Sequence, residues 1–174
     1  MGFYSRWRDA VVVVPSGDSN FPLVTENAGR NDARGVEFLA SRHWSHWSVE
    51  GNVSYVDSRN LTTDEDYVAF PRWIGNLILG YQWPEHGLKV EWLQRLQADV
   101  SEGTLSSTRP APENLPILAR SDIQLTQRLN QDLQFEVHIF NLFDRDNFVP
   151  SVWGAENGLP GQPFAVQFGV TASF

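Results

Sequence analysis

The chain has 174 residues and a formal net charge of −8 at pH 7, with 13 lysine and arginine residues against 21 aspartate and glutamate residues. Nucleic acids and anionic lipid headgroups both attract clusters of basic residues, so neither is expected as a partner. The chain contains no cysteine, which excludes disulfide bonds, thiolate metal ligands and thiol catalysis. Its longest apolar run covers residues 10–14, far short of the roughly 18 residues that indicate a transmembrane helix.

Eight segments in which apolar and polar residues alternate follow one another along the chain. The first lies within residues 3–14. In the other seven, the apolar positions are Val36, Phe38 and Ala40; Trp47, Val49, Val53 and Tyr55; Trp73, Leu77, Leu79, Tyr81 and Trp83; Leu88, Val90, Trp92, Leu96 and Ala98; Ile117, Ala119, Ile123 and Leu125; Leu133, Phe135, Val137 and Ile139; and Phe164, Val166, Phe168, Val170, Ala172 and Phe174. A period of two is the pattern of a strand with one apolar face. The sequence therefore predicts an all-β protein of about eight antiparallel strands.

Strand length and the connections between strands favour a membrane-spanning sheet over a soluble one. Alternation alone also describes a soluble sandwich or a lipocalin-like binder with an apolar cavity. Several segments, however, run for about 10 residues, which suits a tilted transmembrane strand better than a globular strand of about 5 to 6. Long connections alternate with short ones, the long at 15–31, 57–71, 100–116 and 144–163 and the short at 43–46, 84–87 and 130–131. Long extracellular loops and short periplasmic turns are typical of outer-membrane β-barrels.

Aromatic residues lie at both ends of the predicted strands. Near the short turns are Trp44, Trp47, Trp83 and Phe174, and near the long loops are Tyr55, Trp73, Phe143 and Phe164. Amphipathic rings are stable at headgroup level, and outer-membrane barrels carry aromatic girdles at both interfaces. The alternative places the tryptophans in the core of a soluble β-protein. Their position at strand ends favours an antiparallel transmembrane β-barrel segment in contact with outer-membrane lipid.

Several segments resemble the closing region of TonB-dependent receptors. They are Asn-Leu-Phe-Asp at 141–144, Gly-Leu-Pro-Gly-Gln-Pro-Phe at 158–164, and an alternating strand that ends in the aromatic residue Phe174. Upstream, residues 4–9, 26–29 and 34–37 resemble earlier strands of the same barrels. The resemblance covers essentially the whole chain.

The resemblance implies a bacterial outer-membrane barrel of roughly 22 strands around a plugged lumen. Residues 1–174 would be its C-terminal portion, about the last third, without the plug domain and earlier strands. The parent receptor would import a scarce nutrient, most often a ferric siderophore, with energy from TonB acting through the missing N-terminal part. The last strand would be the signal read by the barrel-assembly machinery, carried by Phe164, Val166, Phe168, Val170 and Phe174.

The start of the chain bears on whether it is complete. Met1 is followed by Gly2, Phe3 and Tyr4, with no basic segment leading into an apolar region, so no secretory signal is visible. For an outer-membrane protein this predicts a fragment. The alternative is a self-contained eight-stranded outer-membrane protein with a structural or adhesive role. Such a closed barrel would pair residues 4–12 with residues 164–174.

Candidate contacts with a small-molecule ligand lie on the polar face of one strand and in the last long loop. They are Lys89, Glu91, Arg95 and Asp99, which are expected to face the lumen, and Phe148 and Trp153 in the 145–162 loop. Neighbouring lumen charges also pair with one another or with a plug. Aromatic residues in a loop also anchor it to the barrel rim.

The sequence gives no sign of an enzyme, a metal centre or a cofactor site. His43, His46, His86 and His138 lack the spacing of metal ligands. The acidic residues 64–66 lack the spacing and glycine of a calcium loop. The chain also has no Gly-x-Ser-x-Gly nucleophile turn. We therefore expect no enzymatic activity and no cofactor.

Overall fold

The computed structural model describes residues 1–15, 23–61, 65–66, 70–100, 115–150 and 158–173. This part is mostly strand, with one short 3-10 turn, η1 (Pro84–His86). None of its helices is long and apolar enough to cross a membrane. The strands are β1 (Gly2–Pro15), β2 (Leu23–His43), β3 (Trp47–Asn60), β4 (Glu65–Asp66), β5 (Trp73–Trp83), β6 (Leu88–Ala98), β7 (Leu118–Arg128), β8 (Leu133–Phe140), β9 (Phe148–Val149), β10 (Leu159–Pro160) and β11 (Ala165–Ala172).

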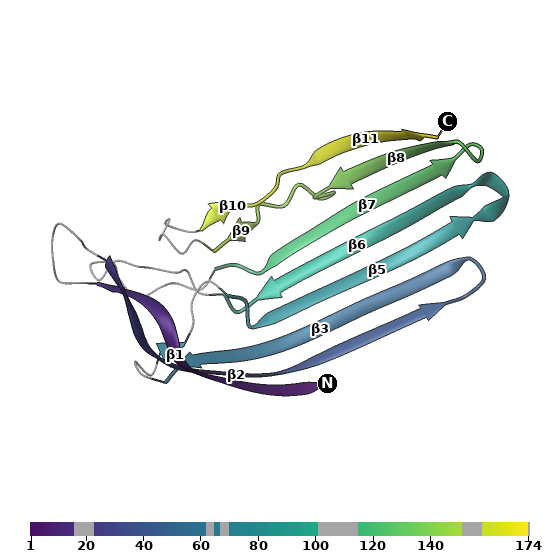
Figure 1. Cartoon of the computed structure of the whole chain (residues 1–174). Coiled ribbons are helices and arrows are strands. Elements are labelled where there is room, and N and C mark those ends of the chain that lie inside the picture. The colour runs from purple at the N-terminus through teal and green to yellow at the C-terminus, as the bar shows by residue number, and fades with distance from the viewer. Residues whose placement is uncertain (16–22, 62–64, 67–69, 101–114, 151–157, 174) are drawn as a thin grey trace.

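Eight of these strands form one antiparallel sheet in the order β1-β2-β3-β5-β6-β7-β8-β11 (Figure 1). Strand β4 pairs with the end of β3, and β9 and β10 form a separate two-stranded ladder. The turns between β2 and β3, β5 and β6, and β7 and β8 all lie at one end of the sheet, which we call the short-turn end (Figure 1). The opposite end is the long-loop end. The predicted all-β architecture with eight main antiparallel strands is confirmed.

Strands β1 and β11 lie at opposite edges of the sheet (Figure 1). In the described part of the chain, β1 pairs with β2, starting with Gly2 opposite Val36, and β11 pairs with β8, starting with Ala165 opposite Phe140. The two edges are not paired with each other there, so the sheet is open. A closed eight-stranded barrel requires this pairing and therefore does not describe the structure.

The first hairpin is longer than the sequence predicts. Instead of a loop over 15–31, β1 continues to Pro15 and β2 begins at Leu23, and these two residues are opposite each other in the ladder. Residues 23–31 show no regular alternation of apolar and polar residues, and their pairing with β1 makes them a strand. The prediction of a loop is therefore wrong for residues 23–31.

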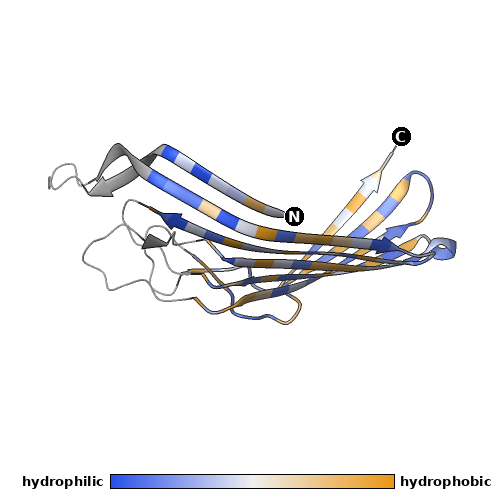
Figure 2. Ribbon diagram, turned by 90° about the horizontal axis from the view of Figure 1, so that it is seen from below, coloured by the Kyte–Doolittle hydropathy of each residue, from blue (hydrophilic) through white to orange (hydrophobic). Residues whose placement is uncertain are grey.

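Backbone pairing aligns residues of like character across the sheet. One row consists of Val49, Leu79, Trp92, Ile123, Ile139 and Val166. The adjacent row on the other side consists of His43, Ser48, Gly80, Glu91, Gln124, His138 and Gln167. Because successive residues of a strand point to opposite sides, these rows define an apolar face and a polar face. Figure 2 shows the resulting alternation of hydrophobic and hydrophilic residues along the strands.

In the described part of the chain, no layer of side chains covers the apolar face. Among the described residues, the buried hydrophobic side chains are Ala33, Val100 and Leu115, whereas Phe38 and Phe168 are 65% and 75% exposed. A soluble sandwich or a lipocalin-like binder buries its apolar face in a core or cavity. The described sheet therefore lacks the packing on which the soluble alternatives depend.

Candidate functional site

Aromatic rings lie against one another at both ends of the apolar face. At the short-turn end the Tyr81 ring lies 4.5 Å from Trp47 and 4.1 Å from Trp83, both in edge-on geometry, measured between ring centroids. At the long-loop end the rings of Tyr55 and Trp73 are 4.7 Å apart. Such pairs stabilise neighbouring strands beyond the area that they bury. The rings occupy the two strand ends at which the sequence predicts aromatic girdles.

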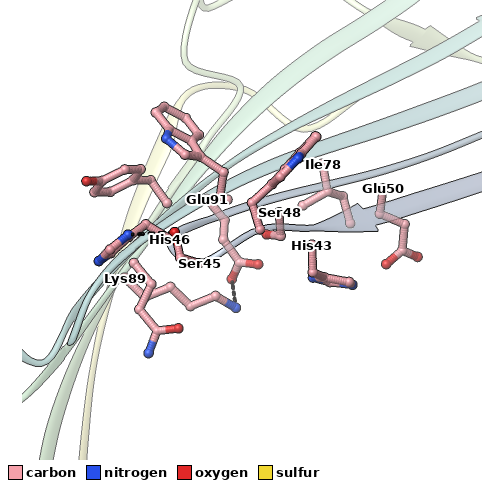
Figure 3. Close-up of a pocket in the computed structure, with 13 residues that line it drawn as sticks. His43, Ser45, His46, Ser48, Glu50, Ile78, Lys89 and Glu91 are labelled. Atoms are coloured by element: carbon pink, nitrogen blue, oxygen red, sulfur yellow. Dashed lines mark hydrogen bonds and ion pairs between the residues drawn. The ribbon is translucent and has the colours of Figure 1, made fainter.

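The polar face carries a hollow of about 370 Å³ at the short-turn end (Figure 3). His43 of β2, Ser48 and Glu50 of β3, and Lys89 and Glu91 of β6 line it. The Lys89 ammonium lies 2.8 Å from the Glu91 carboxylate, so these two predicted ligand contacts bind each other. No described group of three or more His, Asp or Glu side chains is placed to hold a metal ion.

A second hollow, of about 120 Å³, lies on the polar face toward the long-loop end. Arg95 of β6 and Arg120 of β7 are opposite each other in the ladder, and both line this hollow. Nη2 of Arg120 lies 2.8 Å from Oδ2 of Asp122, whose side chain is almost fully buried. The sequence singles out Arg95 but misses Arg120, although Arg120 and Asp122 alternate with the apolar residues of the same strand.

The remaining predicted ligand contacts lie elsewhere. Asp99 follows the end of β6 with a φ of 57°, and its Oδ2 lies 3.5 Å from Nη1 of Arg72. Phe148 is half-buried and pairs with Pro160 in the β9–β10 ladder. Trp153 lies outside the described residues. Four predicted polar contacts are thus divided among three places: the Lys89–Glu91 pair, the hollow beside Arg95, and the ion pair of Asp99.

The Asn-Leu-Phe-Asp segment at 141–144 fastens the last loop to the sheet. Asn141 is 1% exposed, and its Nδ2 donates to the backbone carbonyls of Arg145 and Gln162 at 3.0 and 3.1 Å. Its Oδ1 accepts from the Arg145 N–H at 3.1 Å, and its own N–H donates to Oδ1 of Asp122 at 2.8 Å. A buried amide that uses its donors and acceptor in this way fixes the surrounding backbone.

Two further side chains complete this fastening. Oδ1 of Asp144 accepts from the N–H of Phe164 at 3.1 Å, just before β11. Oδ1 of Asn147 accepts from the N–H of Ala119 in β7 at 2.9 Å, and the Asn147 carbonyl accepts from the N–H of Gly161 at 2.7 Å. We call Asn141, Asp144 and Asn147 the clasp. The clasp joins β7, β8 and the start of β11. One of its members, Asn147, lines the hollow beside Arg95.

The predicted assembly segment coincides with the edge strand β11. Phe164, Val166, Phe168 and Val170 are all exposed, and the last three lie on the apolar face. Phe174 lies outside the described residues. In the described part, β11 has a partner on one side only, β8, so its other edge is open to a further strand.

A sequence model described as the TonB-dependent receptor-like β-barrel matches residues 2–142. The chain belongs to this family. No curated protein has a sequence that matches it significantly. The clasp residue Asn141 and the strands before it thus lie within the matched part of a TonB-dependent receptor barrel. The recognition of the family from 141–144 and the last strand is confirmed.

Solved structures of TonB-dependent receptors share the fold. The FrpB iron transporter from Neisseria meningitidis (F3-3 variant) superposes with a TM-score of 0.78 at 20% identity, over 99% of this chain and 28% of that one. The copper transporter OprC gives 0.78 at 15% identity over the same shares. The siderophore receptor PiuA from Acinetobacter baumannii gives 0.71 at 14% identity, over 97% of this chain and 25% of that one. The chain thus spans little more than a quarter of these receptors.

Proposed function

We propose that the chain is the C-terminal part of the barrel wall of an outer-membrane receptor, and that the complete receptor imports a scarce nutrient. The observation that carries this proposal is the open sheet, whose β1 and β11 edges lack a partner in the described residues. In a bilayer each unsatisfied backbone group costs several kcal/mol, so spanning sheets have to close. Further strands of a longer receptor would supply that closure.

The cargo proposed is a ferric siderophore. The neighbours in fold include an iron transporter and a siderophore receptor, which support an iron chelate, and a copper transporter, which makes copper the alternative. The charged and amide side chains of the polar face suit a polar ligand within a water-filled lumen. A transport role rather than catalysis accords with the TonB-dependent receptor family.

Three partners belong to the same proposal. Outer-membrane lipid would cover the apolar face, where Phe38, Phe168 and Val170 are exposed. The barrel-assembly machinery would recognise β11, an apolar edge strand with an open side. TonB would act through parts of the receptor outside this chain. The first two partners account for surfaces that the chain itself leaves uncovered.

Uptake by whole cells tests the proposal. The gene encoding the receptor is deleted, and uptake of ⁵⁵Fe bound to a panel of siderophores is compared with that of ionic ⁶⁴Cu. We expect one ferric siderophore to lose its uptake, the intact gene to restore it, and a strain without TonB to show the same loss. A loss of copper uptake alone would refute the siderophore assignment. Unchanged uptake of every cargo would refute nutrient import.

A further inference from the structure

We propose that Arg95 and Arg120 form a binding site for a carboxylate-like oxyanion of the imported ligand. The inference rests on the proposed import function and concerns the hollow at the long-loop end of the polar face. The two guanidinium groups come from adjacent strands, and the register places them directly opposite each other. Like charges directly opposite in a ladder destabilise a sheet, so an anion bound between them would stabilise this pair.

The protein itself supplies only part of that compensation. Asp122 binds Nη2 of Arg120, and the other carboxylate oxygen of Asp122 accepts the N–H of Asn141. Nε of Arg120 is buried without a hydrogen-bond partner. Among the described residues, the Arg95 guanidinium likewise has no carboxylate within ion-pair distance. The one carboxylate, Asp122, thus pairs with Arg120 and leaves the charge of Arg95 without an acidic partner among the described residues.

The hollow has the size and the lining of an oxyanion site. Its volume of about 120 Å³ accommodates one carboxylate or phosphate group of a larger ligand. Gln97 and Gln162 add side-chain amides to the lining, and amides donate hydrogen bonds to anionic oxygens. The planar guanidinium group presents paired N–H donors that match carboxylate geometry. An oxyanion in the hollow would lie beside the two arginines that line it and offset the repulsion between their charges.

The clasp keeps this site formed. Asn147 accepts hydrogen bonds from the N–H groups of Ala119 in β7 and of Gly161, and the side chain of Asn141 donates one to the carbonyl of Gln162. These bonds hold the loop wall beside the arginines before any ligand arrives. Binding to a preformed site loses less conformational entropy than binding that must order a loop.

The polar face provides an internal comparison. At the short-turn end, Lys89 is bound by Glu91 on the same strand, 2.8 Å away, and its charge is compensated. Arg95, further along β6, has no such acid beside it: the intervening polar-face residue is Leu93. Because Lys89 already has an acidic partner and Arg95 does not, we expect the anion to bind at Arg95 and Arg120 rather than at Lys89.

The test uses the intact purified receptor and two probes, citrate as a polycarboxylate and glycerol as a neutral polyol, with binding measured by calorimetry. We expect citrate to bind and glycerol not to bind. Arg95→Gln and Arg120→Gln should each weaken citrate binding about 10-fold or more, the size of a charge-assisted bond. Arg120→Lys should not restore full affinity, because Lys lacks the planar fork. The matched control Lys89→Gln should leave affinity unchanged.

Several outcomes would overturn the proposal. One is that the wild-type receptor does not bind citrate. Another is that both arginine variants bind it like wild type, or that Lys89→Gln weakens it equally. A third is that citrate fails to bind while Arg120→Gln lowers the melting temperature, which would indicate that an acidic side chain of the receptor occupies the hollow.

Thermal unfolding of each variant checks folding, and Arg95→Lys keeps the charge if Arg95→Gln does not fold. Cellular uptake of the cargo is scored separately, so loss of this site and loss of the import function are distinguishable.

Discussion

Val166 and Gln167 are neighbours on β11, yet they belong to opposite faces of the sheet and to rows of opposite chemistry. The row of Val166 is apolar across six strands, and the row of Gln167 is polar apart from Gly80. The apolar face is regular and uncovered, whereas the polar face is irregular, with hollows, ion pairs and buried amides. The apolar face thus presents a continuous hydrophobic surface, whereas the polar face presents individual charged and hydrogen-bonding groups.

The largest effect is expected from placing a charge on the apolar face. Phe168→Arg should lower the free energy of unfolding by about 2 to 4 kcal/mol in a bilayer, because a charged side chain must then leave water for hydrocarbon. Gln167→Arg, one residue away on the polar face, is the matched control and should have little effect. Denaturant unfolding of the intact receptor in lipid vesicles measures both. Equal losses would refute the assignment of the faces.

Removing the buried amide of the clasp should have the next largest effect. Asn141→Ala leaves the N–H of Arg145 and the carbonyls of Arg145 and Gln162 without their partner. Each unsatisfied buried group costs about 1 to 3 kcal/mol, and we expect a net loss in that range. Asn130→Ala removes an exposed bond to the N–H of Asp132 and should cost under about 0.5 kcal/mol. A loss no larger at Asn141 than at Asn130 would contradict the clasp.

The turn between β5 and β6 depends on a left-handed residue. Gly87 has a φ of 63°, and an added Cβ would run into the backbone carbonyl of Arg128. We expect Gly87→Ala to cost at least about 1 to 2 kcal/mol, because the left-handed conformation alone carries this penalty for a residue with a Cβ and the contact with the carbonyl adds to it. Gly75→Ala near the start of β5 is the control, because its Cβ meets no atom closer than 3.9 Å. The melting temperature of Gly87→Ala should lie below that of Gly75→Ala. Equal melting temperatures would show that the turn tolerates a side chain.

The smallest effect concerns the ion pair at the short-turn end. The side chains of Lys89 and Glu91 are 44% and 21% exposed, so water screens their attraction. A double-mutant cycle with Lys89→Gln and Glu91→Gln should give a coupling of about 0.2 to 1 kcal/mol, decreasing with added salt. A coupling well above this range, or one insensitive to salt, would show that the pair is dehydrated.

The main strands and their apolar face could be predicted from the sequence. A period of two is a local property of the sequence, so all eight main strands were predicted from alternating residues such as those of β6 and β11. The short strands β4, β9 and β10 were not predicted, because two residues carry no period and pair only through their tertiary surroundings. The extended β1–β2 hairpin was missed for a related reason: residues 23–31 show no regular period of two, and only their pairing with β1 places them in a strand.

The contacts of the polar face depend on register, which one sequence does not specify. Arg95 was predicted to face the lumen, but its position opposite Arg120 follows only from the pairing of β6 with β7. The clasp segment was found by family resemblance, while its physical role appears only with its partners. Asn141 binds residues 19 and 21 positions away, Asp122 and Gln162. Such distant partners leave no local pattern.

The difference between the two faces is tested most directly by the surroundings of individual side chains along β6. A spin label is attached to single cysteines introduced from Leu88 to Ala98 in the intact receptor in lipid vesicles, since this chain has no cysteine of its own. Collision rates with oxygen, which concentrates in lipid, are compared with those of a water-soluble nickel chelate. The account predicts high oxygen collision at Val90, Trp92 and Leu96 and high nickel collision at Lys89, Glu91 and Arg95. A profile without a two-residue period, or with the opposite phase, would contradict it.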